Sequence, residues 1–188
     1  MLLSDGYAAY AHYPQKSGLT HAQCSAHTRR LLFEAQGVEP QAPAQGLDLI
    51  GERYAVKGRL GELKLGADRK RADRLTHAKP IVERFFAWIN DQFEAQGLLP
   101  SNPLIKALSY ASERRCGLEV DLNDPRAPID PNHLERALKA IALGRSNWLF
   151  ARSLRASQRA AAVMSLIQSA KLNGHDPFRR DRRVADAR

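Results

Sequence analysis

The organisation of the chain is read most directly from residues 129–138, Ile129-Asp130-Pro131-Asn132-His133-Leu134-Glu135-Arg136-Ala137-Leu138. This stretch predicts the start of a helix, because Pro131 followed by Asn132 is typical of a helix entry, with Asn132 as the N-cap. Apolar residues then recur with the spacing of one helical face. We therefore expect a stripe that packs against the core, made of Leu134, Leu138 and Ile141.

Glu135 lies beside that stripe, in the first turn of the expected helix, and has two interpretations. In the first, it completes a capping box by accepting a hydrogen bond from the backbone N–H of Asn132. In the second, its carboxylate faces a cleft and binds a metal ion. Both roles require an acidic residue in the first helical turn, so the spacing leaves both open.

A second candidate carboxylate, Asp5, is expected at the end of a short strand. Residues 2–5 are expected to form the end of a short strand, and residues 19–24 a second strand. The carboxyl ends of strands line the crevice in sheets that are flanked by helices, so Asp5 would face such a crevice. The alternative is a turn aspartate, because Asp5-Gly6 is a common turn pair.

Several motifs occur together, and in the order that they have in a known family. Besides residues 129–150, these motifs are Leu3-Ser4-Asp5-Gly6-Tyr7-Ala8-Ala9-Tyr10, Thr20-His21-Ala22-Gln23-Cys24-Ser25-Ala26-His27-Thr28-Arg29-Arg30, Ser165-Leu166-Ile167 and Ala170-Lys171-Leu172-Asn173-Gly174-His175-Asp176-Pro177. The chain resembles the insertion sequence 66 family of transposases, from residue 2 to about residue 178. It departs from the family pattern at Ser25, where the family has tryptophan.

The resemblance implies an RNase H-like fold with a DDE triad of two aspartates and one glutamate. Asp5 matches the second aspartate and Glu135 the glutamate, so both are candidate catalytic and metal-binding residues. The first aspartate would belong to a strand that precedes residue 1. Hard oxygen ligands suit Mg²⁺ or Mn²⁺. A pair of such ions can activate the attacking oxygen and stabilise the leaving oxygen in DNA cleavage and strand transfer.

These observations predict an α/β protein that is mostly helical, with a partial RNase H-like core interrupted by a helical insertion. Residues 1–36 would form the first part of the core and carry the Asp5 strand. Residues 37–127 would form the insertion. Residues 128–188 would form the second part of the core, with the Glu135 helix and a basic tail. A chain of 188 residues can bury a sizeable core.

Positive charge is concentrated in the last third of the chain. The net charge is +9; residues 133–188 hold 12 Lys or Arg against 4 Asp or Glu, whereas residues 1–132 hold 17 against 16. This asymmetry favours a polyanionic partner, nucleic acid before membrane, with a solvated basic tail as the alternative. Residues expected to contact DNA phosphates are Arg136, Arg145, Asn147 and Arg152. The resemblance specifies the partners as transposon ends, target DNA, and a further copy of this chain or a full-length transposase.

The expected helices of the insertion have clear apolar patterns. A 3.6-residue period predicts one buried face on a helix after Pro80, made of Ile81, Phe85, Ile89 and Phe93, joined by Phe86 and Trp88. Asn102 and Pro103 open another helix, with an inward face of Leu104, Ala107, Leu108 and Ala111. Residues 37–46 are expected to be a linker, and the charged residues 68–74 a solvated helical face.

Other features restrict the remaining possibilities. His21, Cys24 and His27 suggest zinc, but a structural zinc site usually has four ligands and no partner pair has suitable spacing. Two cysteines make no disulfide framework, which fits a reducing cytoplasm. No apolar run approaches the ~20 residues of a membrane span, and no signal peptide is visible. We expect a cytoplasmic bacterial protein that associates with the nucleoid through DNA.

Two functions of different classes follow. The first is a catalytic-domain fragment of a DNA transposase, inactive alone because one aspartate of the triad is missing. The alternative is a non-catalytic DNA-binding remnant that modulates a full-length transposase. The basic residues 179–183 replace an apolar helix of the family, which indicates a truncated or frame-disrupted copy, or one segment of a split gene.

Overall fold

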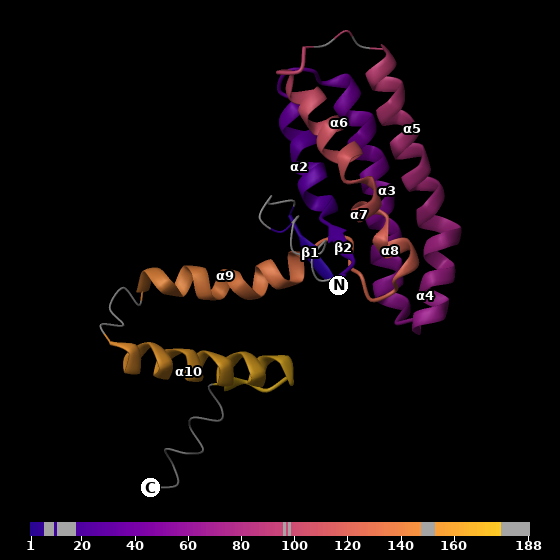
Figure 1. The fold of residues 1–188 in the computed structure, drawn as a ribbon. Helices are drawn as coiled ribbons and strands as arrows, with labels where there is room; N and C mark the ends of the chain where they lie inside the picture. The colour runs from indigo at the N-terminus through magenta and orange to yellow at the C-terminus, as the bar shows by residue number, and fades with distance from the viewer. Residues whose placement is uncertain (6–9, 11–17, 96, 98, 148–152, 178–188) are drawn as a thin grey trace, which may run out of the picture. The chain divides into compact units, whose positions relative to one another are not determined.

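The structure, a computed structural model, describes residues 1–5, 10, 18–95, 97, 99–147 and 153–177. This part of the chain is mostly helical, with one small sheet (Figure 1). It divides into two compact units, Met1–Arg136 and Ala137–Arg188. The elements are β1 Leu2–Ser4, β2 His21–Gln23, α2 Ser25–Ala35, α3 Gln41–Leu63, α4 Ala67–Asp73, a π-helical turn Arg74–Ala78, α5 Lys79–Ala95, α6 Pro103–Glu113, α7 Arg115–Leu118, α8 Val120–Asn123, α9 Asn132–Asn147 and α10 Leu154–Leu172.

The sheet consists of two short parallel strands, β1 and β2, in the register Leu2↔His21, Leu3↔Ala22 and Ser4↔Gln23. Both strands were predicted from the sequence. Asp5 follows β1 directly, so it lies at the carboxyl end of its strand, as expected. At the same end of the sheet, Cys24 leads from β2 into α2. This edge therefore brings Asp5 and the start of α2 together.

The core of the first unit is built by α2, α3, α5 and α6, which lie alongside one another (Figure 1). The predicted stripe on α5 is confirmed for Ile81, Phe85 and Ile89, which are buried with Phe86 and Trp88. It is wrong for Phe93, which is 39% exposed, since none of the described residues of α5 after Ile89 is buried. The predicted face of α6 is confirmed at all four positions, Leu104, Ala107, Leu108 and Ala111.

The sequence prediction failed at the start of α3. Residues 37–46 were expected to form a linker, but α3 already begins at Gln41. Pro43 is tolerated because the first turn of a helix has no internal acceptor for its backbone N–H groups. Gly46 is buried against the ring of Trp88, whose Nε1–H donates to Oε1 of Gln45 at 3.1 Å. The composition suggested a linker, but these small residues allow a close helix contact.

Substituting Gly46 should show how close that contact is. A Cβ at this position would lie 2.5 Å from Cη2 of Trp88 and 3.1 Å from Cδ1 of Leu32. We expect Gly46→Ala to lower the free energy of unfolding by about 1–3 kcal/mol through overpacking. Gly51→Ala in the same helix meets nothing within 4 Å and should stabilise by about 0.5–1 kcal/mol. Urea denaturation measures the free energy of unfolding of both variants. A change of the same sign in Gly46→Ala and Gly51→Ala would contradict the close contact of Gly46 with Trp88.

Charge misled the prediction at Arg74. Residues 68–74 were expected to be a solvated face, and α4 indeed has no buried residue. Arg74, however, is only 6% exposed, because its guanidinium donates to backbone carbonyls of the α8 segment. On α2, Leu32 occupies the buried face, and its neighbour Phe33 is 60% exposed.

The helix that contains Glu135 begins differently from the prediction. Asn132 is the first residue of α9 rather than its cap, and its backbone N–H donates to Oδ1 of Asp130 at 3.0 Å. The capping carboxylate is therefore that of Asp130, and the capping-box role of Glu135 is wrong. Leu134 and Leu138, expected to be buried, are 51% and 60% exposed, while the side chain of Ile141 lies outside the described part. Leu134 therefore does not pack against the core of the first unit.

The second unit contains the rest of α9 and the whole of α10. The helix α9 continues through Asn147. Ser153 caps α10, since its Oγ accepts a hydrogen bond from the backbone N–H of Ala156 at 3.2 Å. Gly174 follows the helix with a φ of +71°, which favours glycine. Within the described residues, none of the helices is long and apolar enough to cross a membrane.

Candidate active site

Asp5 is held at the end of β1 by residues of two helices. Tyr110 of α6 donates a hydrogen bond from its hydroxyl to the backbone carbonyl of Asp5 at 2.6 Å. The Asp5 carboxylate lies 4.0 Å from Nε2 of His27, which belongs to the first turn of α2. The Asp5 side chain is 48% exposed and that of His27 20% exposed. The backbone of Asp5 is thus anchored, while its carboxylate remains accessible.

Neighbouring side chains stabilise this end of the sheet. Oγ of Ser4 and Nε2 of His21 are 2.7 Å apart, and Nε2 of Gln23 is 3.2 Å from the same ring nitrogen. Burial, with a contribution from the positive charge of Arg114, holds the pKa of His21 below its usual value. The Arg114 guanidinium in turn lies 4.0 Å from the ring centroid of Tyr110, within the range of a cation–π interaction. His21 is therefore a neutral structural residue at neutral pH.

Glu135 lies in the first turn of α9 and is exposed. The segment before α9 is tied to the start of α2, because the backbone N–H of Ser25 donates to the carbonyl of Ile129 at 2.9 Å. Burial raises the pKa of the Cys24 thiol, and the negative charges of Asp130 and Glu135 raise it further. Asp5 lies 4.0 Å from His27, and the charge of Glu135 reaches Cys24, so both carboxylates lie near the start of α2.

A buried ion pair anchors the beginning of α9. Oδ2 of Asp130 lies 2.6 Å from Nζ of Lys57 on α3, and Asp130 is only 1% exposed. Burial by itself raises the pKa of Asp130, but hydrogen bonds from Lys57 and from the Asn132 N–H outweigh burial and hold the pKa below its usual value. Asp130 is therefore ionised at neutral pH. It fixes the turn that presents Glu135.

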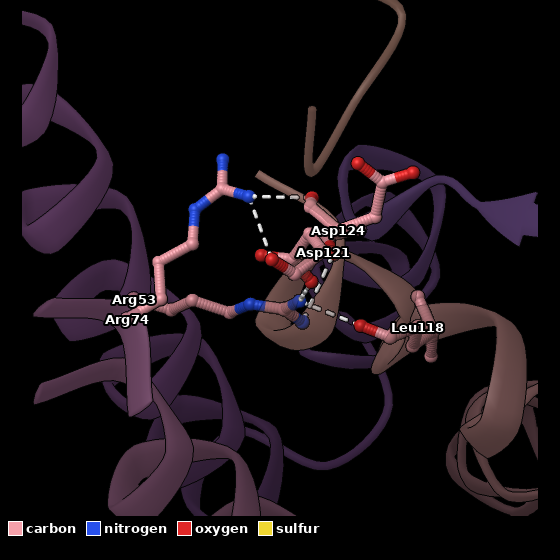
Figure 2. Close-up of polar contacts among 6 residues, drawn as sticks. Arg53, Arg74, Leu118, Asp121 and Asp124 are labelled. Carbon is pink, nitrogen blue, oxygen red and sulfur yellow. Dashed lines mark hydrogen bonds and ion pairs between the residues drawn. The ribbon is translucent and has the colours of Figure 1, made fainter. Parts of the chain in front are cut away.

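A second buried network, formed by Arg53 and Arg74, fixes α8 (Figure 2). Nη2 of Arg53 donates to Oδ1 of Asp121 at 2.5 Å and to the carbonyl of Leu118 at 2.6 Å. Nη1 of Arg74 donates to the carbonyls of Asp121 and Asp124 at 2.6 and 3.1 Å. Sequence reasoning missed both arginines. A signal existed for Arg53, because it lies on the same helical face of α3 as the buried Gly46, Ile50 and Leu60.

The oxygen atoms of Asp5 and Glu135 are the donor type that Mg²⁺ and Mn²⁺ prefer. These are two carboxylates, whereas the DDE triad has three. Among the described residues, no group of three or more His, Cys, Asp or Glu side chains is placed to hold a metal ion. His27 adds a nitrogen near Asp5, and its Nδ1 is buried without a hydrogen-bond partner in the described part of the chain. By donor chemistry alone, these two carboxylates could supply some of the oxygen ligands of a divalent ion. His21, Cys24 and His27 make no zinc set within the described residues.

The residues expected to contact DNA lie in and after α9. Arg136 is exposed on α9, and so is Lys139 one turn later. Arg145 and Asn147 belong to the last turn of α9, but their side chains lie outside the described part, as does the whole of Arg152. On α10, Arg155, Arg159 and Lys171 are exposed. The described cations of this segment are therefore free to meet a polyanion.

Comparison with known proteins adds a family and several relatives. The Transposase IS66 family matches residues 1–159. Three proteins of Sinorhizobium fredii (strain NBRC 101917 / NGR234), each described as uncharacterized, are similar to the chain. The protein y4hP is 30% identical over 172 residues, which are 85% of this chain and 30% of that protein. The protein y4qI is 31% identical over 95% of this chain and 34% of its own length. The protein y4jD is 28% identical over 95% of this chain and 35% of its own length.

The chain spans about a third of the length of the curated relatives that it matches. No solved structure matches the chain.

Proposed function

Because the chain belongs to the Transposase IS66 family, we propose that it carries two carboxylates of a transposase active site, Asp5 and Glu135, and a basic segment that binds DNA. Family membership supports a role in the transposition of an insertion sequence. The observation that carries the proposal is the neighbourhood of α2. His27, in its first turn, lies beside Asp5, and the charge of Glu135 acts on Cys24, which precedes the helix.

The proposed architecture follows the family. Residues 1–36 and 128–188 would form two parts of an RNase H-like core, and residues 37–127 a helical insertion between them. The parallel pair of β1 and β2, with a carboxylate directly after β1, supports this proposal. The hydrogen bond between Ser25 and Ile129 also supports it, because it joins segments on either side of the proposed insertion.

Each residue near the proposed site has a separate task. Asp5 and Glu135 would hold a divalent cation, Mg²⁺ or Mn²⁺, which supplies Lewis-acid activation of a phosphodiester when it is bound. His27 would orient the Asp5 carboxylate, and Tyr110 holds the Asp5 backbone through its carbonyl. Asp130, bonded to Lys57, keeps the first turn of α9 in place so that Glu135 is presented at the same end of α2.

Cation binding can be tested without any cleavage. We expect the chain to bind Mn²⁺, and Asp5→Asn and Glu135→Gln each to weaken its affinity at least about tenfold, because each removes one ligand charge. Electron paramagnetic resonance of free Mn²⁺ measures this directly. Glu94→Gln, an exposed glutamate of α5, is the matched control and should leave the affinity unchanged. Equal Mn²⁺ affinities of the unmodified chain and all three variants would reject the two-carboxylate site.

DNA binding and cleavage form the second test. The purified chain is expected to bind duplex DNA without sequence preference and not to nick supercoiled plasmid in Mg²⁺, since two carboxylates alone hold a second ion poorly. If about 4–6 cations meet phosphates, the slope of log K against log salt should be roughly −4 to −5. Robust Mg²⁺-dependent nicking that Glu135→Gln abolishes would overturn the expected inactivity of the isolated chain.

A pair of charge variants locates the DNA-binding segment. Replacing Arg155 and Arg159 of α10 by glutamine should reduce the magnitude of the salt slope by about 2, one unit for each lost phosphate contact. The control replaces Lys79 and Arg84 of α5 by glutamine, with the same change in net charge. Equal slopes for the two double variants would show that net charge alone, rather than the basic segment, attracts DNA.

The second candidate function is a non-catalytic DNA-binding protein that modulates a full-length transposase. It is favoured by one observation, the incomplete set of metal ligands within the described residues. The two proposals differ in the Mn²⁺ experiment. A modulating protein would bind DNA with the expected salt slope but would show no Mn²⁺ affinity that depends on Asp5 and Glu135.

A further inference from the structure

A cavity of about 230 Å³ lies in the first unit, between α3, the α4 segment and the chain that follows α8. It is large enough for a tetrahedral oxyanion and several waters, since a water occupies about 30 Å³ in the liquid. Its wall is strongly basic. The cations that line it are Arg53, Lys57, Lys70, Arg74 and Arg126, with Asp121 as the acidic residue of the lining.

The carboxylates around this cavity do not neutralise its cations. Asp121 pairs with Arg53, Asp130 with Lys57 and Asp124 with Arg126. Three carboxylates thus face five cations, which leaves two positive charges without compensation. Lys70 is half-buried, and no carboxylate of the described residues forms an ion pair with it. Burial, together with repulsion from Arg74, lowers the pKa of Lys70.

The donors that remain for a ligand are arranged around the same space. Arg74 makes both of its side-chain hydrogen bonds within the described residues through Nη1, so its Nη2 and Nε are available. The Arg126 side chain is 84% exposed and can move toward a ligand, since its partner Asp124 is also near the surface. A guanidinium presents its N–H groups in a planar fork that matches phosphate oxygens, and an ammonium adds a point charge.

We propose that this cavity is a phosphate-binding site in which Lys70, Arg74 and Arg126 bind the anion. Its phosphate can come from a nucleic-acid backbone or from free phosphate, which present the same chemistry. The site is separate from the Asp5 and Glu135 carboxylates, so it does not depend on the catalytic proposal. An anion there would neutralise the uncompensated charge and connect α4 to the segment that leads into α9.

The test measures inorganic phosphate binding to the whole chain by isothermal titration calorimetry, at constant ionic strength set with chloride. We expect phosphate to bind and to raise the melting temperature above that in chloride alone. Lys70→Met should weaken phosphate affinity about tenfold. The matched control is Lys106→Met on α6, an exposed lysine with the same loss of charge that does not line the cavity, and its affinity should equal that of the unmodified chain.

Arg126→Met provides a second variant, and it should also weaken phosphate affinity several-fold. Its side chain is largely exposed, so its loss does not disturb the buried network. Absence of phosphate binding beyond the chloride control would overturn the proposal. Equal phosphate affinities of Lys70→Met and Lys106→Met would overturn it as well.

A parallel titration with a short DNA duplex distinguishes the two sources of phosphate. If the site binds the DNA backbone, Lys70→Met should weaken DNA affinity more than Lys106→Met, and phosphate should compete with DNA. If it binds free phosphate, the two variants should bind DNA equally while only Lys70→Met loses phosphate. Both results support the site, and loss of the Mn²⁺ affinity described above would affect neither.

Discussion

Arg53→Met is expected to lower the free energy of unfolding by about 3–5 kcal/mol, because it leaves the buried carboxylate of Asp121 without its cation. The side chains of Arg53 and Asp121 are 9% and 5% exposed, so water cannot replace the lost partner. The same guanidinium also donates to the Leu118 carbonyl and to Oγ of Ser25 at 3.2 Å. One side chain therefore joins α3 to α8 and to the start of α2. Urea denaturation with linear extrapolation measures the change.

The matched control is Arg84→Met, which removes the same type of side chain from a surface ion pair with Glu52. Both partners are about half exposed, so the expected change is about 0–1 kcal/mol. A double variant, Arg53→Met with Asp121→Leu, should be less destabilised than either single variant, since neither member of the Arg53–Asp121 pair is then buried without the other. Equal losses for Arg53→Met and Arg84→Met would show that the buried pair contributes no more than a surface pair.

The parts of the fold that could be predicted from the sequence are those in which local pattern and burial agree. The stripe Ile81, Phe85 and Ile89 repeats with the helical period, and Asn102 caps α6 by accepting from the Leu104 N–H at 2.7 Å. The short strand before Asp5 was also predicted. The start of α3 was not, because glycine and proline usually indicate a linker. The close approach of Gly46 to Trp88 is a tertiary contact that no local pattern encodes.

In the candidate site, too, some residues could be predicted from the sequence and others could not. Asp5 and Glu135 were selected by resemblance to a family, and their roles remain predictions. The cap of α9 was assigned to Asn132, because asparagine before a helix is a common cap; Asp130, two residues earlier, does this instead. The burial of Arg53 and Arg74 could not be read from charge, since isolated arginines are usually exposed. Their partners between Leu118 and Asp124 lie 47 to 68 residues further along the chain, so only the fold brings them together.

Phe85→Ala is expected to cost about 3–5 kcal/mol, the usual range for removing a buried aromatic side chain from a tightly packed site. Phe85 is 7% exposed. Its ring makes an edge contact with Phe86, with centroids 5.4 Å apart, and stacks on Trp88 at 5.8 Å. Truncation therefore removes two ring contacts as well as buried area, and leaves a cavity beside the contact between α3 and α5. Urea and thermal denaturation should both report the loss.

Phe93→Ala is the control that separates burial from side-chain type. It lies on the same helix and in the same 3.6-residue stripe, but its side chain is 39% exposed. We expect a loss of about 1 kcal/mol or less, because most of the area removed from Phe93 already contacts water. The ratio of the two losses then tests whether α5 packs as the structure shows. Similar losses for Phe85→Ala and Phe93→Ala would mean that the end of α5 is buried by a contact outside this unit.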